Sequence, residues 1–117
     1  MKHVIVAGSR VSTFPVRDIY DTLDHYLGDE EVTIISGGAR GVDAIGEEWA
    51  ISRGKPYIVV KADWALHGRS AGYLRNLDMA EIADVLMAFQ SNNSPGTGHM
   101  INIAKKKGLQ VYEFEDK

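Results

Sequence analysis

The sequence contains no cysteine, so disulfide bonds and thiolate catalysis are both excluded. It also has no apolar run that approaches the length of a membrane span. The apolar run at residues 4–7 stops at Gly8 and is too short for the core of a signal peptide. From these absences we expect a cytoplasmic protein that has no membrane partner.

A surplus of positive charge is missing as well. The chain has 16 Asp and Glu residues against 13 Lys and Arg residues, which gives a formal net charge of −3. Non-specific DNA binders usually carry a basic surplus, because neutralising phosphates drives their affinity. Nucleic acid is therefore not favoured as a partner, although a cleft can concentrate positive potential on an acidic protein.

Two classes of catalytic site lack their usual residue patterns. The histidines at positions 3, 25, 67 and 99 show no spacing typical of a metal site, so we expect no metal. The serines have no convincing His and Asp partners, so a hydrolase triad is not supported either.

The chain does contain a regular alternation of short apolar runs and longer amphipathic stretches. The runs predict strands at residues 4–7, 32–35, 57–60, 85–89 and 110–114. The stretches predict helices at residues 15–27, 42–53, 71–82 and 97–107, with an irregular segment at 61–70. Such alternation favours a parallel sheet covered on both faces. We predict a single α/β domain over residues 1–117, with a Rossmann-like, doubly wound fold and a mainly parallel five-stranded sheet.

The segment after the second predicted strand has the composition of a phosphate-binding loop. It reads Ser36-Gly37-Gly38-Ala39-Arg40-Gly41-Val42-Asp43. Its glycines let the backbone approach a ligand, and the helix that follows points free N–H groups at the same place. Arg40 would add a forked cation for phosphate, while Asp43 would cap the helix or hold a ribose hydroxyl. The alternative is a tight turn between strand and helix, which uses the same glycines.

Similar turns follow the first and fourth predicted strands. The turn after the first strand holds Gly8, Ser9 and Arg10, and the turn after the fourth strand holds Gly96 and Thr97. Each turn by itself is compatible with a plain loop. Because the carboxyl ends of parallel strands lie at one edge of the sheet, the three turns together predict a cleft lined by backbone donors and hydroxyls.

Other side chains have two interpretations. Arg75 and Asn76 lie within a predicted helix, where a surface role is as plausible as a ligand contact. Trp64 and Tyr73 are interpreted as core or interface residues rather than base-stacking residues. The pair Glu47-Glu48 is interpreted as a solvated helix face.

Segments at residues 4–10, 36–43, 64–79 and 94–101, in this order, give the chain a family resemblance. The set resembles the SLOG superfamily, named for Smf (DNA-processing protein A) and Lonely Guy, and within it the short YspA-like branch of bacteria and phages. The resemblance implies a Rossmann-like fold that binds or processes nucleotides or nucleotide-derived signals. It also implies a pocket lined by Gly8, Ser9, Arg10, Ser36, Gly37, Gly38, Arg40, Gly41, Asp43, Arg75, Asn76, Gly96 and Thr97.

The sequence departs from two branches of that superfamily. Lonely Guy enzymes cleave the N-glycosidic bond of nucleoside monophosphates with a glutamate three residues after a Gly-Thr pair. Here the pair is Gly96-Thr97 and that position holds Met100, so the carboxylate that would stabilise an oxocarbenium-like transition state is missing unless Asp43 or Glu47 replaces it. DNA-processing proteins share the glycine-rich loop and bind single-stranded DNA, but this chain has no interleaving of aromatic and basic residues.

The leading hypothesis is therefore a binding module for a nucleotide or nucleotide-derived small molecule, acting as a sensor or a sequestering protein. Its phosphate would bind the glycine-rich loop after the second strand, and no cofactor would be required. A nucleotide N-glycosidase or phosphoribohydrolase and a single-stranded DNA binder are the alternatives. We also expect a homo-oligomer, with Trp49, Trp64 or Tyr73 as interface anchors.

Overall fold

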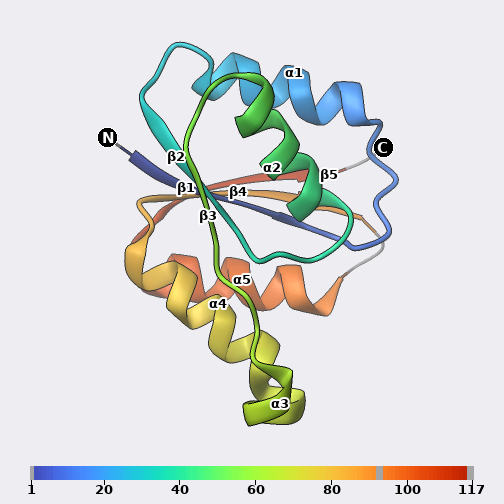
Figure 1. Cartoon of the computed structure of the whole chain (residues 1–117), viewed down its shortest axis with the longest axis vertical. Coiled ribbons are helices and arrows are strands. Elements are labelled where there is room, and N and C mark those ends of the chain that lie inside the picture. Colours follow the sequence, from blue (N-terminus) through green and yellow to red (C-terminus); the bar gives the residue numbers. More distant parts are fainter. Residues whose placement is uncertain (1, 92–93, 116–117) are drawn as a thin grey trace.

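The computed structural model describes residues 2–91 and 94–115. Its centre is a sheet of five parallel strands in the order β3-β2-β1-β4-β5 (Figure 1). The strands are β1 (Lys2–Gly8), β2 (Val32–Ser36), β3 (Tyr57–Val59), β4 (Val85–Gln90) and β5 (Gln110–Glu115). The prediction of a Rossmann-like α/β fold with a parallel five-stranded sheet is confirmed.

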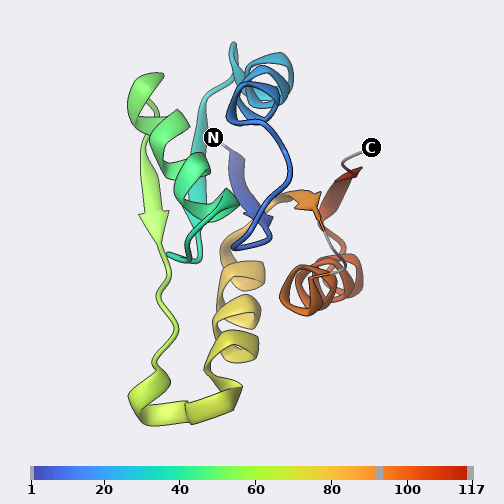
Figure 2. The ribbon, with the colours of Figure 1, turned by 90° about the vertical axis from the view of Figure 1, so that its right-hand side faces the viewer.

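Helices cover both faces of the sheet, with α1 and α2 on one face and α4 and α5 on the other (Figures 1 and 2). The four helices are α1 (Val16–Leu27), α2 (Val42–Ser52), α4 (Ala71–Ile82) and α5 (Pro95–Lys106). A short helix α3 (Trp64–His67) and a 3₁₀ turn (Gly68–Ser70) lead into α4 and lie away from the sheet. Within the described part of the chain, every helix is too short or too polar to cross a membrane.

Strand β1 shows how one apolar run packs on two sides. Successive side chains of a strand point to opposite faces of the sheet. Val4 and Val6 accordingly join the core cluster that contains Leu23 of α1 and Trp49 of α2. Ile5 joins the other cluster, which contains residues of α4 and α5. The two helical layers therefore share a sheet that is buried on both faces at its centre.

The structure differs from the prediction at the edges of several elements. Residues 61–70 were expected to be irregular, but the side chain of Asp63 accepts a hydrogen bond from Leu66 N at 3.0 Å and caps α3. Helix α5 begins at Pro95, two residues before the predicted helix, because proline is compatible with the first helical turn. Strand β3 lies at the edge of the sheet, where Tyr57 stays 42% exposed.

Two side chains of α2 are placed differently from their interpretation. Trp49 is fully buried, and its Nε1 donates a hydrogen bond to Asp24 Oδ1 at 2.9 Å. The prediction that Trp49 anchors an interface is therefore wrong. Glu47 is half-buried and accepts a hydrogen bond from Ser36 Oγ at 2.6 Å, so the solvated helix face includes Glu48 but not Glu47.

Candidate functional site

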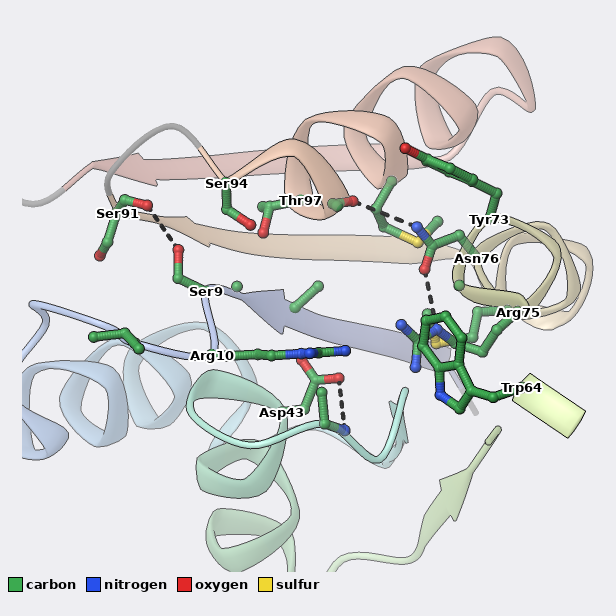
Figure 3. A pocket seen from close by; sticks show the side chains of 18 of the residues that line it. Ser9, Arg10, Asp43, Trp64, Tyr73, Arg75, Asn76, Ser91, Ser94 and Thr97 are labelled. Carbon is green, nitrogen blue, oxygen red and sulfur yellow. Dashed lines mark hydrogen bonds between the residues drawn. The ribbon is translucent and has the colours of Figure 1, made fainter. Parts of the chain in front are cut away.

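The strand order locates the point at which a ligand can enter this fold. From β1 the sheet extends through β2 to β3 on one side and through β4 to β5 on the other. In doubly wound sheets the crevice opens beyond the carboxyl ends of the two strands at this reversal. A cavity of about 470 Å³ lies there, lined by residues that follow β1, β2 and β4 and by residues of α3 and α4 (Figure 3).

Hydrogen bonds join the segments that follow β1 and β4. Ser9 Oγ donates to the carbonyl oxygen of Ser91 at 2.7 Å, and both residues are buried. Ser91 Oγ in turn accepts from the backbone N–H of Thr13 at 3.2 Å. These bonds connect residues about 80 positions apart in the chain, and they fix one wall of the cavity.

Two glycines allow the loop after β1 to pack against the loop after β2. A Cβ on Gly8 would lie 2.5 Å from the carbonyl oxygen of Phe89 and 2.6 Å from Cγ2 of Val42. Gly41 has a φ of 76°, and its Cβ would lie 2.3 Å from the carbonyl oxygen of Ser9. All three distances are too short for a Cβ atom, so both glycines are required for packing, and Gly41 is required for its backbone conformation as well.

The hydroxyl of Ser36 is used within the glycine-rich loop itself. It donates to Glu47 Oε2 at 2.6 Å and accepts from Gly38 N at 3.1 Å. Ser36 is fully buried, while the side chain of Arg40 is exposed. The loop is therefore shaped by its own hydrogen bonds, and Ala39 and Asp43 are the members of it that line the cavity.

Asp43 is a carboxylate held against the cavity in the first turn of α2. It is 6% exposed, and its Oδ2 accepts from Ala39 N at 3.4 Å. Burial raises the pKa of Asp43 to about 6; the nearby Glu47 also raises it, while the bond from Ala39 and the charge of Arg75 oppose the rise. Asp43 is thus part-protonated near pH 6 and charged above it.

Arg75 and Asn76 of α4 connect the loop after β2 to the start of α5. Arg75 Nη1 donates to the carbonyl oxygen of Gly37, and Arg75 Nε donates to Asn76 Oδ1 at 3.2 Å. Asn76 Nδ2 donates to the carbonyl oxygen of Gly96 at 3.4 Å and lies 3.1 Å from His99 Nδ1. Asn76 is 5% exposed, so the alternative of a plain surface role is wrong for this residue.

The first turn of α5 presents polar groups to the cavity. Ser94 is the N-cap residue, yet its side chain makes no capping hydrogen bond. Helix geometry leaves the N–H groups of Gly96 and Thr97 without intrahelical partners. Within the described part of the chain, the hydroxyls of Ser94 and Thr97 make no hydrogen bond. Ser94, Gly96 and Thr97 all line the cavity.

Two aromatic side chains complete the lining at the α3 and α4 end (Figure 3). Trp64 is 52% exposed and Tyr73 is 50% exposed, so neither belongs to the core. Sequence reasoning missed them as site residues. The available signal was their position after β3, because that segment lies at the same edge of the sheet as the other turns. Among residues 2–91 and 94–115, no acidic or histidine side chains are grouped to hold a metal ion.

Comparison with known proteins assigns the chain to a family. The model of the YspA, cpYpsA-related SLOG family matches residues 2–67. A curated relative, the gene 61 protein of Mycobacterium phage D29, is 38% identical over 125 residues, an alignment that covers 100% of this chain and 99% of the relative. The chain belongs to this SLOG family.

Solved structures share the fold of this SLOG chain. DNA processing protein A (DprA) from Streptococcus pneumoniae has a TM-score of 0.75 at 18% identity, and the match covers 96% of this chain and 49% of that protein. DNA processing protein A from Helicobacter pylori, described for its single-stranded DNA binding mode, has a TM-score of 0.77 at 19% identity. That match covers 99% of this chain and 66% of the Helicobacter pylori protein. TM1055 has a TM-score of 0.71 at 21% identity, and the match covers 95% of this chain and 72% of TM1055. The SLOG chain thus spans about half the length of the pneumococcal protein.

The cavity of this SLOG chain brings together many of the predicted pocket residues. Those that line it are Gly8, Ser9, Arg10, Asp43, Arg75, Asn76, Gly96 and Thr97. Those that lie outside the lining are Ser36, Gly37, Gly38, Arg40 and Gly41. Met100, which occupies the position of the Lonely Guy glutamate, also lines the cavity and is buried. The carboxylate in the lining is that of Asp43.

Proposed function

We propose that this SLOG domain binds a nucleotide or nucleotide-derived small molecule in the cavity, with the phosphate at the start of α5. The observation that carries the proposal is the pair of hydroxyls of Ser94 and Thr97, which have no partner among the described residues. They lie beside backbone N–H groups that have no intrahelical partner, in a cavity that also contains Arg10. Helix N-termini of this kind bind phosphate through N–H groups and the helix dipole.

The charges around the cavity support an anionic ligand. Arg10 and Arg75 both line it. Burial lowers the pKa of Arg75, the charge of Asp43 opposes this, and the charge of Arg10 adds to the lowering. Within the part of the chain that the structure describes, Arg10 forms no salt bridge. A phosphate would relieve the repulsion between the two guanidinium groups and accept their forked hydrogen bonds.

The start of α2 is less suited to phosphate than the sequence indicated. The N–H of Val42 already donates to the carbonyl oxygen of Ser9 at 3.3 Å. The carboxylate of Asp43 lies in the same turn and would repel a second anion. We therefore assign the phosphate to α5 and leave Asp43 to accept a ribose hydroxyl, which a carboxylate binds readily.

Calorimetry with AMP, ADP-ribose and NAD tests the proposal. We expect binding of at least one of the three, and a loss of about tenfold or more in affinity for Arg10→Ala. Arg40→Ala is the matched control, because Arg40 is an exposed arginine outside the cavity lining. Absence of binding by all three nucleotides would contradict the proposal. Chromatography of the same mixtures for free base measures N-glycosidase activity in parallel.

Single-stranded DNA is the second candidate ligand, and one observation favours it. The Helicobacter pylori structure that shares this fold is described for its single-stranded DNA binding mode. The net charge of −3 argues against an extended contact with many phosphates. Fluorescence anisotropy with a labelled oligonucleotide at several salt concentrations distinguishes the two ligands. A strong salt dependence, together with competition by AMP, would place one nucleotide of the strand in the same cavity.

A further inference from the structure

Trp64 and Tyr73 form one end of the cavity, and Ser9, Ser91 and Ser94 lie toward the other end (Figure 3). Trp64 is the first residue of α3, and Tyr73 lies in the first turn of α4. About half of each side chain is exposed, although each lines a concave site. The cavity therefore has an aromatic end and a hydroxyl-rich end.

Both rings are supported from one side. A Cβ on Gly72 would lie 3.5 Å from Cη2 of Trp64, so the tryptophan ring packs over a residue that has no side chain. The ring of Tyr73 contacts His99 edge to face, with 4.4 Å between the ring centroids and an angle of 79°. Each ring thus has a contact on one side, while about half of the residue stays exposed and lines the cavity.

The support behind Tyr73 is uncharged. Arg75 Nε can only donate, so the atom of Asn76 that it contacts is the oxygen, and Asn76 Nδ2 must face His99. An amide nitrogen donates, and His99 Nδ1 therefore accepts and carries no proton. Burial also lowers the pKa of His99, which agrees with a neutral ring. His99 therefore adds no charge beneath Tyr73. The charge near Trp64 comes from Arg75, whose Nη2 lies 4.0 Å from the Cβ position of Gly72, and a guanidinium group also stacks on planar rings.

We propose that Trp64 and Tyr73 hold a nucleobase, so that the ligand of this site is a base-bearing nucleotide with its base at the α3 end and its phosphate at the start of α5. The inference rests on the proposed function, because it needs a phosphate-bound ligand that spans the cavity. Stacking on an aromatic ring tolerates every base, since each base has a π-face. Purine nucleotides bind more tightly than pyrimidine nucleotides, because their larger rings cover more of the aromatic surface.

The test compares AMP with ribose 5-phosphate on the whole chain. The wild type is expected to bind AMP about tenfold or more tightly than ribose 5-phosphate, because the sugar phosphate lacks the base. Trp64→Ala should bring the two affinities close together by weakening AMP alone. Trp64→Phe should retain most of the AMP affinity. Leu66→Ala is the matched control, because Leu66 lies on the same short helix, is 71% exposed and does not line the cavity.

The outcomes separate the two proposals. Equal affinity of the wild type for AMP and ribose 5-phosphate overturns the base site and leaves the phosphate site intact. Absence of binding by both compounds overturns the proposed function and the base site with it. A Trp64→Ala chain that binds AMP normally but changes its oligomeric state in sedimentation velocity also overturns the base site, because the aromatic pair would then be an interface between copies.

Discussion

The carboxylate of Asp43 and the guanidinium of Arg75 converge on Gly37. A Cβ at that position would lie 2.8 Å from Asp43 Oδ2 and 2.8 Å from Arg75 Nη1. Arg75 also donates a hydrogen bond to the carbonyl oxygen of Gly37. The absence of a side chain at Gly37 thus permits Asp43 and Arg75 to approach each other, and only glycine fits there without displacing one of them.

Gly37→Ala is expected to displace Arg75 or Asp43 and so to damage both stability and binding. The free energy of unfolding should fall by about 1–3 kcal/mol, the usual range for overpacking. AMP affinity should fall by about tenfold. Urea denaturation and calorimetry measure the two effects. Gly98→Ala is the control, because a Cβ there meets no atom of the described residues within 4 Å outside the backbone of its own helix, and alanine favours the helix. A similar loss in this variant would contradict the argument.

Asp43→Asn is expected to stabilise the ligand-free protein at alkaline pH. The folded state raises the pKa of Asp43 from 3.8 to about 6, so it binds the proton more tightly than the unfolded state does. Stability from this group is fully present below pH 3.8 and is lost as the pH rises through 6. The gain from asparagine should therefore approach about 3 kcal/mol at pH 8 and shrink toward pH 4.

Urea denaturation at pH 4, 6 and 8 measures this dependence. Asp29→Asn, which changes an exposed carboxylate in a loop, serves as the control. A gain of equal size at all three pH values would show that the burial of charge at Asp43 is not its cause. The same Asp43→Asn chain should bind AMP more weakly, because an amide is a poorer acceptor for a ribose hydroxyl than a carboxylate.

Asp24 is expected to stabilise the contact between α1 and α2. Its carboxylate accepts from Arg53 Nε and Nη2 at 2.8 Å each and from Trp49 Nε1 at 2.9 Å. The bonds from Arg53 and then Trp49 lower the pKa of Asp24 to about 2. Stability from this group is present above pH 3.8 and is lost as the pH falls through about 2.

Asp24→Ala should consequently lower the melting temperature by a few degrees at pH 7, because it leaves the Trp49 N–H without its partner. Thermal unfolding followed by circular dichroism measures the change. The difference from the wild type should narrow as the pH falls from 4 toward 2. Asp21→Ala, at an exposed position on the same helix, should change the melting temperature much less.

Ser94→Ala separates binding from stability. Ser94 occupies the N-cap position of α5, but its hydroxyl caps nothing and makes no other hydrogen bond within the described residues. We expect a change of less than about 0.5 kcal/mol in the free energy of unfolding and a loss of about tenfold in AMP affinity. Ser91→Ala is the contrasting variant, because its Oγ accepts two hydrogen bonds from Thr13. A large loss of stability in Ser94→Ala would show that this hydroxyl stabilises the folded protein, and it would contradict the prediction.

The sequence by itself determined the elements of this protein and the edge of the sheet where its small polar turns gather. The alternation in β1, with Val4 and Val6 on one side and Ile5 on the other, encodes a strand buried on both faces. Glycines after β1 and β2 indicated close approach of backbone. These signals are local, because periodicity and turn composition act over a few residues.

Only the tertiary structure decided which strand ends are neighbours and where each side chain points. The order β3-β2-β1-β4-β5 places the turn after β1 beside the turn after β4, and a bond from Ser9 to Ser91 joins them across 82 positions. It also buries the hydroxyl of Ser36 within its loop and turns Trp64 toward the cavity. Such pairings depend on packing between distant segments, and no local pattern records them.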